Sequence, residues 1–92
     1  MAKSESVERH EVEHATKRAF AKVLKQARST HKGGALTQEA LAYEAGYDRT
    51  YIYKLEKAMY QPSLSSFITL SKQLGISPIT MLRAVLKEME RL

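Results

Sequence analysis

The chain has 92 residues, of which 43% are hydrophobic and 27% are charged, and it contains no cysteine. A chain of this length forms one compact domain and is too small to enclose a deep cleft between two lobes. The absence of cysteine excludes disulfides, thiolate zinc sites and cysteine nucleophiles, and the absence of a long apolar run argues against a membrane span. Because the first residues are charged where a secretory peptide is apolar, we expect a cytoplasmic protein.

The net charge of +5 favours an anionic partner, because lysine and arginine release counterions from phosphate polymers. This charge is unevenly distributed along the chain. Residues 1–35 contain eight basic and four acidic side chains, whereas residues 36–62 contain three basic and four acidic ones. We therefore expect most of the attraction to an anion to come from outside residues 36–62.

The pattern of apolar residues predicts an all-α fold with a long first helix. Between residues 7 and 30, apolar side chains recur at steps of three and four residues, as in Phe20, Val23, Leu24 and Ala27. The same helix leaves basic residues on its solvent side: Lys17, Arg18, Lys22 and Lys25. We interpret residues 1–16 as a helical extension of the domain.

Four shorter helices are predicted from capping residues. Thr37 can cap a second helix that Gly46 ends, and Asp48 can cap a third helix over residues 49–57. Ser63 can cap a fourth helix that ends before Gly75. Pro78 can occupy the first position of a fifth helix that continues towards residue 92.

The second and third predicted helices fit a helix-turn-helix, in which a short turn containing glycine joins two helices. Ala42 lies where the two helices approach too closely for a large side chain, and Gly46 lies in the turn, where φ is positive. Inward positions are filled by Leu41, Ala45, Tyr47, Ile52 and Leu55. This spacing predicts a third helix that is anchored on one side and projects on the other.

Residues 36–82 read LTQEALAYEAGYDRTYIYKLEKAMYQPSLSSFITLSKQLGISPITML. This stretch resembles the phage-repressor-like helix-turn-helix regulators, also called Cro-like or XRE-type. Within it, residues 48–52 are similar to the controller proteins of restriction–modification systems. The resemblance implies a compact five-helix bundle with a lambda-repressor-like fold, whose core is residues 36–82 of a single domain spanning residues 1–92. It also implies a repressor or controller that binds an operator in double-stranded DNA, without a cofactor or catalysis.

The resemblance implies a role for particular side chains of the motif. Residues expected to read bases are Arg49, Thr50, Tyr53 and Lys54. Residues expected to contact phosphates are Gln38, Tyr51 and Lys57. Glu56 matches an acidic position that pairs with an arginine of the first helix, for which Arg28 is the candidate, so this pair is expected to be structural.

One position departs from the family pattern. Ala58 stands where a glycine commonly follows the glutamate of the third helix, so we expect either a strained left-handed cap or a different course of the loop. The remaining aromatic residues near the motif, Tyr43, Tyr47 and Tyr60, are expected to pack in the core or at its rim, because proteins that read duplexes rarely stack on bases.

Two alternatives of another class remain open. Residues 10–14 spell H-E-V-E-H, which satisfies the pattern of zinc proteases, although we interpret this charged segment as a solvated helical turn with no metal site. The second alternative is an antitoxin or co-regulator whose main contact is another protein, bound through the amino-terminal helix. This alternative stays open because residues 36–62 contain more acidic than basic side chains, which is unfavourable for binding DNA.

The end of the chain predicts a homodimer. Its apolar residues Val85, Leu86, Met89 and Leu92 supply more apolar surface than a small bundle needs. The alternative is that this surface packs against the extended first helix of the same chain. In a twofold dimer the third helices would lie about 34 Å apart and would bind a pseudo-palindromic operator.

Overall fold

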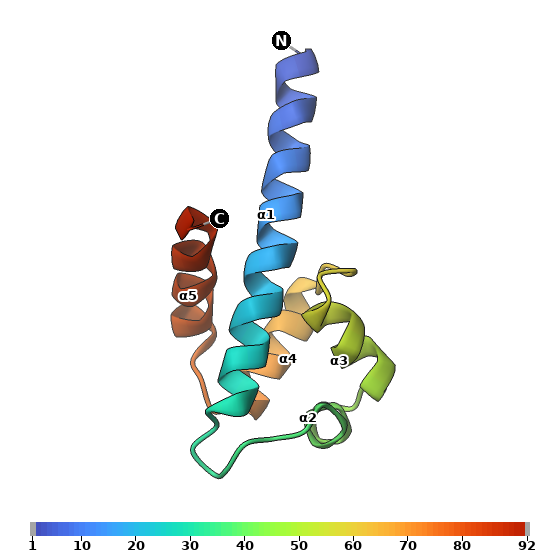
Figure 1. Ribbon diagram of the computed structural model, residues 1–92, viewed down its shortest axis with the longest axis vertical. Coiled ribbons are helices and arrows are strands. Elements are labelled where there is room, and N and C mark those ends of the chain that lie inside the picture. Colours follow the sequence, from blue (N-terminus) through green and yellow to red (C-terminus); the bar gives the residue numbers. More distant parts are fainter. Residues whose placement is uncertain (1, 92) are drawn as a thin grey trace.

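The computed structural model describes residues 2–91 and the side chains of residues 8–91. Within this range the chain forms five helices and no strand, arranged as a small bundle from which one long helix projects (Figure 1). The helices are α1 (Ala2–Ser29), α2 (Gln38–Ala45), α3 (Arg49–Glu56), α4 (Leu64–Gln73) and α5 (Pro78–Arg91). The predicted all-α, five-helix fold is confirmed.

Helix α1 begins at Ala2, within the segment expected to be a helical extension and ahead of the apolar periodicity. The apolar periodicity used for the prediction starts at Val7, but the residues before it include no helix breaker, so the helix continues through them. With 28 residues, α1 accounts for most of the longest dimension of the molecule, 48 Å. Its second half packs on the other helices, and its first half extends beyond them (Figure 1).

The core is built from side chains of all five helices. Its largest fully buried apolar side chains are Phe20, Leu24, Leu41, Ile52, Leu55, Leu70 and Met81. Each side chain of this size contributes about 1.5 to 3 kcal/mol when it is fully removed from water. Because both buried residues of α3, Ile52 and Leu55, belong to this core, the position of α3 is fixed by the packing of the whole bundle.

The predicted capping residues act at two of three helix starts. The Thr37 hydroxyl accepts a hydrogen bond from the Ala40 N–H at 2.9 Å, and the Ser63 hydroxyl accepts one from the Ser66 N–H at 3.0 Å. At α3 the prediction is wrong for the side chain: Asp48 has the extended backbone of a capping residue, but its carboxylate makes no capping hydrogen bond.

The loop after α3 keeps the left-handed turn that glycine commonly provides. Ala58 has a φ of +58°, and its N–H donates to the carbonyl of Leu55 at 3.1 Å. The next N–H, of Met59, donates to the carbonyl of Lys54 at 2.9 Å. The helix is therefore capped in the usual way, and the alanine methyl makes this cap about 1 to 2 kcal/mol less favourable.

Helix α5 uses part of its apolar surface inside the chain. Val85 is only 2% exposed, and Met89 is half-buried against α1, where the Thr16 hydroxyl donates to its sulfur at 3.8 Å. The prediction that these two residues face a partner is therefore wrong, because the extended α1 covers them. Leu86 remains 50% exposed, and Leu92 lies outside the described residues. Across residues 2–91, no helix has the length and apolar character needed to span a membrane.

Candidate nucleic-acid interface

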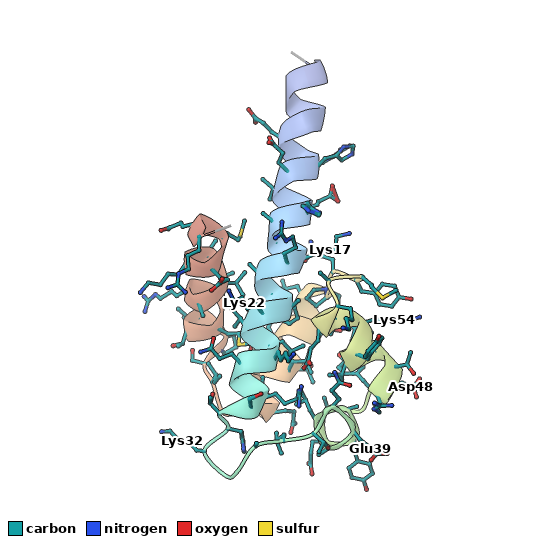
Figure 2. All side chains as sticks on the ribbon, in the orientation of Figure 1. Lys17, Lys22, Lys32, Glu39, Asp48 and Lys54 are labelled. Carbon is teal, nitrogen blue, oxygen red and sulfur yellow. The ribbon has the colours of Figure 1, made fainter. Side chains whose placement is uncertain are left out.

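Helix α3 has one face in the core and one face in solvent. Ile52 and Leu55 are fully buried, while Arg49, Thr50 and Tyr53 are exposed. The turn before it is made possible by Gly46, whose φ of +80° is disfavoured for residues with a side chain. As Figure 2 shows, Asp48 and Lys54 mark the outer side of α3, at the edge of the molecule. The helix thus offers a protruding polar surface about two turns long.

The two lysines of this region both lie beside tyrosine rings. Lys54 is half-buried, and its Nζ donates to the Tyr60 hydroxyl at 3.3 Å and lies 5.2 Å from the centre of that ring. Lys57 follows α3, and its Nζ lies 5.7 Å from the centre of the Tyr53 ring. The rings stabilise the lysines by cation–π attraction and hold them next to the exposed face of α3.

A buried ion pair joins the ends of α1 and α3. Arg28 donates from Nε to Glu56 Oε2 at 2.7 Å and from Nη2 to Glu56 Oε1 at 2.9 Å, and the two side chains are 14% and 4% exposed. Gln38 Nε2 donates to the same carboxylate at 3.0 Å. The Glu56 carboxylate raises the pKa of Arg28 above its ordinary value, while burial opposes this effect. The pair implied by the resemblance is present, and it also holds the first residue of α2.

Tyrosine packing connects the helix-turn-helix to α4. The Tyr47 hydroxyl donates to the Ser66 hydroxyl at 2.8 Å, and the half-buried Tyr51 ring lies 4.9 Å from Tyr47 and 6.3 Å from Tyr60, measured between ring centres. Tyr47 packs against the core, as expected. Tyr60 is 44% exposed and lies beside the Tyr51 ring, outside the core cluster. For Tyr43 the expectation is wrong, since it is 83% exposed. It lies two residues after Leu41 and thus on the opposite face of α2.

An open depression lies between the start of α2 and the start of α3. It has a volume of about 530 Å³ and is lined by Arg28, Thr37, Gln38, Glu39 and Arg49. The free N–H groups at the start of a helix favour anions, and Arg49 adds positive charge, whereas the charge of Arg28 is paired with Glu56. This depression therefore brings together Gln38, which is expected to contact a phosphate, and Arg49, which is expected to read a base.

The histidines of the H-E-V-E-H segment lie on the projecting half of α1. Both His10 and His14 are exposed there. Among the side chains of residues 8–91, no group of three or more histidine, aspartate or glutamate residues is arranged to hold a metal ion. The geometry thus offers no support for a zinc site in this part of the chain.

Two features of this surface were not predicted from the sequence. One is the contact between Lys54 and Tyr60. The other is the position of Arg18, Lys22 and Lys25 beside the end of α3. The spacing of these three basic residues was a usable signal, because steps of four and three residues place them on one face of α1. The contact between Lys54 and Tyr60 depends on the course of the loop after α3, which no sequence pattern near these residues predicts.

A comparison with protein families supplies the decisive observation. The family model described as "Helix-turn-helix" matches residues 34–80, which is just over half of the chain. The chain belongs to the helix-turn-helix family. Its matched segment contains α2, α3, α4 and the start of α5. It therefore includes the exposed face of α3 and every lining residue of the depression except Arg28.

Solved structures of regulators resemble this helix-turn-helix protein. The wild-type restriction–modification controller protein C.Esp1396I is 28% identical, with a TM-score of 0.73 over 82% of this chain and 95% of the controller. The controller C.AhdI from Aeromonas hydrophila is 29% identical, with a TM-score of 0.64 over 71% of this chain and 94% of its own. ClgR, a clp gene regulator from Corynebacterium glutamicum, shares the fold at 22% identity, with a TM-score of 0.74 over 83% of this chain and 78% of its own.

No curated protein sequence matches the chain significantly. The family match and the similarity to controller proteins nevertheless identify this helix-turn-helix protein as a Cro-like, DNA-binding transcriptional regulator.

Proposed function

We propose that this helix-turn-helix protein binds an operator in double-stranded DNA and reads its sequence with the exposed face of α3. The observation that carries this proposal is the division of α3 into a fully buried face, with Ile52 and Leu55, and an exposed face that begins with Arg49 and Thr50. A rigidly held, protruding helix fits the major groove of B-form DNA. The controller C.Esp1396I, to which this chain is similar, has been solved as a tetramer with its natural 35-base-pair operator.

Within this function the exposed residues of α3 have different roles. Arg49 and Thr50 occupy the first turn, where an arginine can bond to both O6 and N7 of guanine and contribute about 1 to 3 kcal/mol of discrimination. Tyr53 and Lys54 lie one turn further, and Lys54 reaches a base only if it leaves Tyr60. Phosphate contacts come from Gln38, Tyr51 and Lys57, which position the protein without reading sequence.

The test is in vitro selection of binding sites by the wild-type protein and by Arg49→Ala. The wild type is expected to select a defined sequence, and the variant to lose the preference for one base, a guanine, with a smaller loss of non-specific affinity. Arg9→Ala, which removes an exposed arginine on the projecting half of α1, is the matched control and is expected to keep the full preference. An unchanged preference in Arg49→Ala would refute the role of Arg49.

The protein is further proposed to act as a homodimer in which residues 1–92 form one domain, with residues 36–82 as its core and residues 1–16 as an extension. On α5, Ile79, Leu82 and Leu86 are 65%, 48% and 50% exposed and share one face. Beside this face lies an apolar groove of about 310 Å³ between α1, α4 and α5, where Leu64 is 76% exposed. Exposed apolar surface of this kind favours association with a second copy.

An antitoxin or co-regulator that binds another protein through α1 is a second candidate. It is favoured by the projecting half of α1, where Val12 is 56% exposed (Figure 1). The match to C.Esp1396I covers 82% of this chain, so part of the chain has no counterpart in that controller. This function predicts a stable complex with the product of a neighbouring gene that Val12→Glu disrupts, and co-purification of the two proteins tests it.

A further inference from the structure

A basic groove lies between α1 and the carboxyl end of α3. It has a volume of about 400 Å³ and is lined by Arg18, Ala21, Lys22, Lys25, Glu56, Lys57 and Ala58. Three of the basic residues come from successive turns of α1, and the fourth follows α3. The helix packing therefore brings Lys57 next to basic side chains that precede it by more than 30 residues in the sequence.

The positive charge of this groove is only partly balanced by its surroundings. Glu56 is the one acidic residue of the lining, and its carboxylate is 4% exposed and paired with Arg28 at 2.7 Å. Lys22 lies 3.0 Å from a carboxylate oxygen of Glu88. Among the side chains that the structure describes, no carboxylate oxygen lies within 4.0 Å of a charged nitrogen of Arg18, Lys25 or Lys57. These three cations remain available to an external anion.

The groove is continuous with the exposed face of α3. Lys57 lines the groove, and its Nζ lies 5.7 Å from the ring centre of Tyr53, which is on that face. A duplex bound to α3 therefore brings its phosphates close to Lys57 and to the adjoining side of α1. We infer that Arg18 and Lys25 of α1 form, with Lys57, a second phosphate-contacting site for duplex DNA, an inference that rests on the DNA-reading function proposed above.

The arrangement suits a phosphate polymer better than a single small anion. Arg18 and Lys25 are two helical turns apart, which is about 10 Å along the axis of α1. One phosphate ion does not span this distance, whereas each DNA strand presents a charge about every 3.4 Å of helix axis. The site also supplies charge that the motif lacks, because residues 36–62 contain more acidic than basic side chains.

The first test measures how binding depends on salt. The probe is a labelled duplex that carries the sequence selected in vitro by the wild-type protein, titrated between about 50 and 200 mM salt. Each phosphate contact contributes about 0.9 to the slope of log affinity against log salt, so Arg18→Gln/Lys25→Gln is expected to lower the slope by about 1.8. The same sequence preference should remain, because phosphate contacts do not read bases.

The control variant removes two positive charges elsewhere. Lys32→Gln/Lys72→Gln changes exposed lysines in the loop after α1 and near the end of α4, and Lys32 lies on the side of the molecule away from Lys54 (Figure 2). This variant has the same net charge and reports the long-range effect of charge alone. If both double variants lower the slope equally, the inferred site is wrong, while wild-type binding to the duplex still supports the DNA-reading function.

The second test measures proximity. Because the chain contains no cysteine, Lys25→Cys provides a unique attachment point for an iron–EDTA reagent that cleaves nearby DNA. Cleavage of the selected duplex next to the bases protected by the wild-type protein is expected from Lys25→Cys and not from Lys32→Cys. Equal cleavage patterns from the two positions, or none from Lys25→Cys in a complex that still forms, would overturn the inference. Failure of the wild-type protein to bind any duplex would instead refute the proposed function.

Discussion

The ion pair between Arg28 and Glu56, with its further hydrogen bonds, connects α1, α2 and α3. It joins α1 to α3, and both partners make a further bond: Arg28 Nη1 donates to the carbonyl of Leu36 at 2.8 Å, and Glu56 accepts from Gln38. Removing two charges from water costs several kcal/mol for each ion, and the cost is offset only while every bond is made. The pair therefore fixes the relative positions of α1, α2 and α3.

Substitution of one partner of this pair is expected to be strongly destabilising. Arg28→Met leaves the Glu56 carboxylate buried without its cation, so the free energy of unfolding should fall by about 3 to 5 kcal/mol. The double variant Arg28→Met/Glu56→Met removes both charges and should recover most of this loss. Urea denaturation of the three proteins measures both effects, and a loss below about 1 kcal/mol in the single variant would contradict this account of the pair.

At the scale of elements, α1 and α5 are connected by a carboxylate as well as by apolar packing. Glu88 of α5 is 8% exposed, and one of its oxygens lies 3.0 Å from Nζ of Lys22 on α1. Arg91 lies 3.6 Å from its other oxygen. The Lys22 ammonium lowers the pKa of Glu88 below its ordinary value of 4.5, against the opposing effect of burial, and Arg91 adds to the lowering.

This contact predicts how stability depends on pH. Because the pKa of Glu88 is lower in the folded than in the unfolded chain, its contribution is fully present above pH 4.5 and is lost as the pH falls through the folded value. The difference in free energy of unfolding between wild type and Glu88→Gln should therefore be constant near neutral pH and shrink in acid. Denaturation across this range is the measurement, with Glu90→Gln, an exposed neighbour, as the control. If the difference in free energy of unfolding between wild type and Glu88→Gln grew as the pH fell, the stabilising role of the ionised Glu88 would be refuted.

At the scale of the whole molecule, the exposed apolar face of α5 is the surface through which we propose that two chains associate. Val85 and Met89 are covered by α1, so the residues left for a partner are Ile79, Leu82 and Leu86. A dimer through this face places two copies of α3 on one molecule. Binding of two half-sites then makes the second contact intramolecular, which raises the overall affinity.

Charge placed on this face is expected to separate the dimer without unfolding the chain. Leu82→Glu/Leu86→Glu alters two side chains that are about half exposed, so the fold should persist and the solution mass should become that of a monomer. Affinity for a two-half-site duplex should fall by about 10²-fold or more, because the second contact is lost. Sedimentation and duplex titration test this, with Thr80→Glu on another face of α5 as the control. A wild-type protein that is monomeric at all concentrations would refute the dimer.

Much of the fold was predictable because it depends on short-range rules. The helix starts at Gln38 and Leu64 follow from the hydroxyls of Thr37 and Ser63, and the turn before α3 follows from Gly46. The left-handed backbone at Ala58 was one of the two outcomes expected there. Each of these features is decided by a few neighbouring residues, since capping and backbone preference act within one helical turn.

Contacts between distant segments were predicted less well. The sequence placed Arg18, Lys25 and Lys57 on solvent-facing positions, but it gave no indication that they line one groove. It also left open whether Val85 and Met89 pack on α1 or on a second chain, and it assigned Tyr43 to the core or its rim although that side chain is 83% exposed. These outcomes depend on how separate helices are oriented.

By itself, the sequence determined the order of the helices, the helix-turn-helix and the exposed residues of α3, because periodicity, caps and a family motif are local properties. The tertiary structure decided which charges gather beside α3, which tyrosines hold its lysines and how much of α5 stays open. The physical reason is that packing energy is shared among side chains from all five helices, so the surroundings of any one residue depend on the placement of the others.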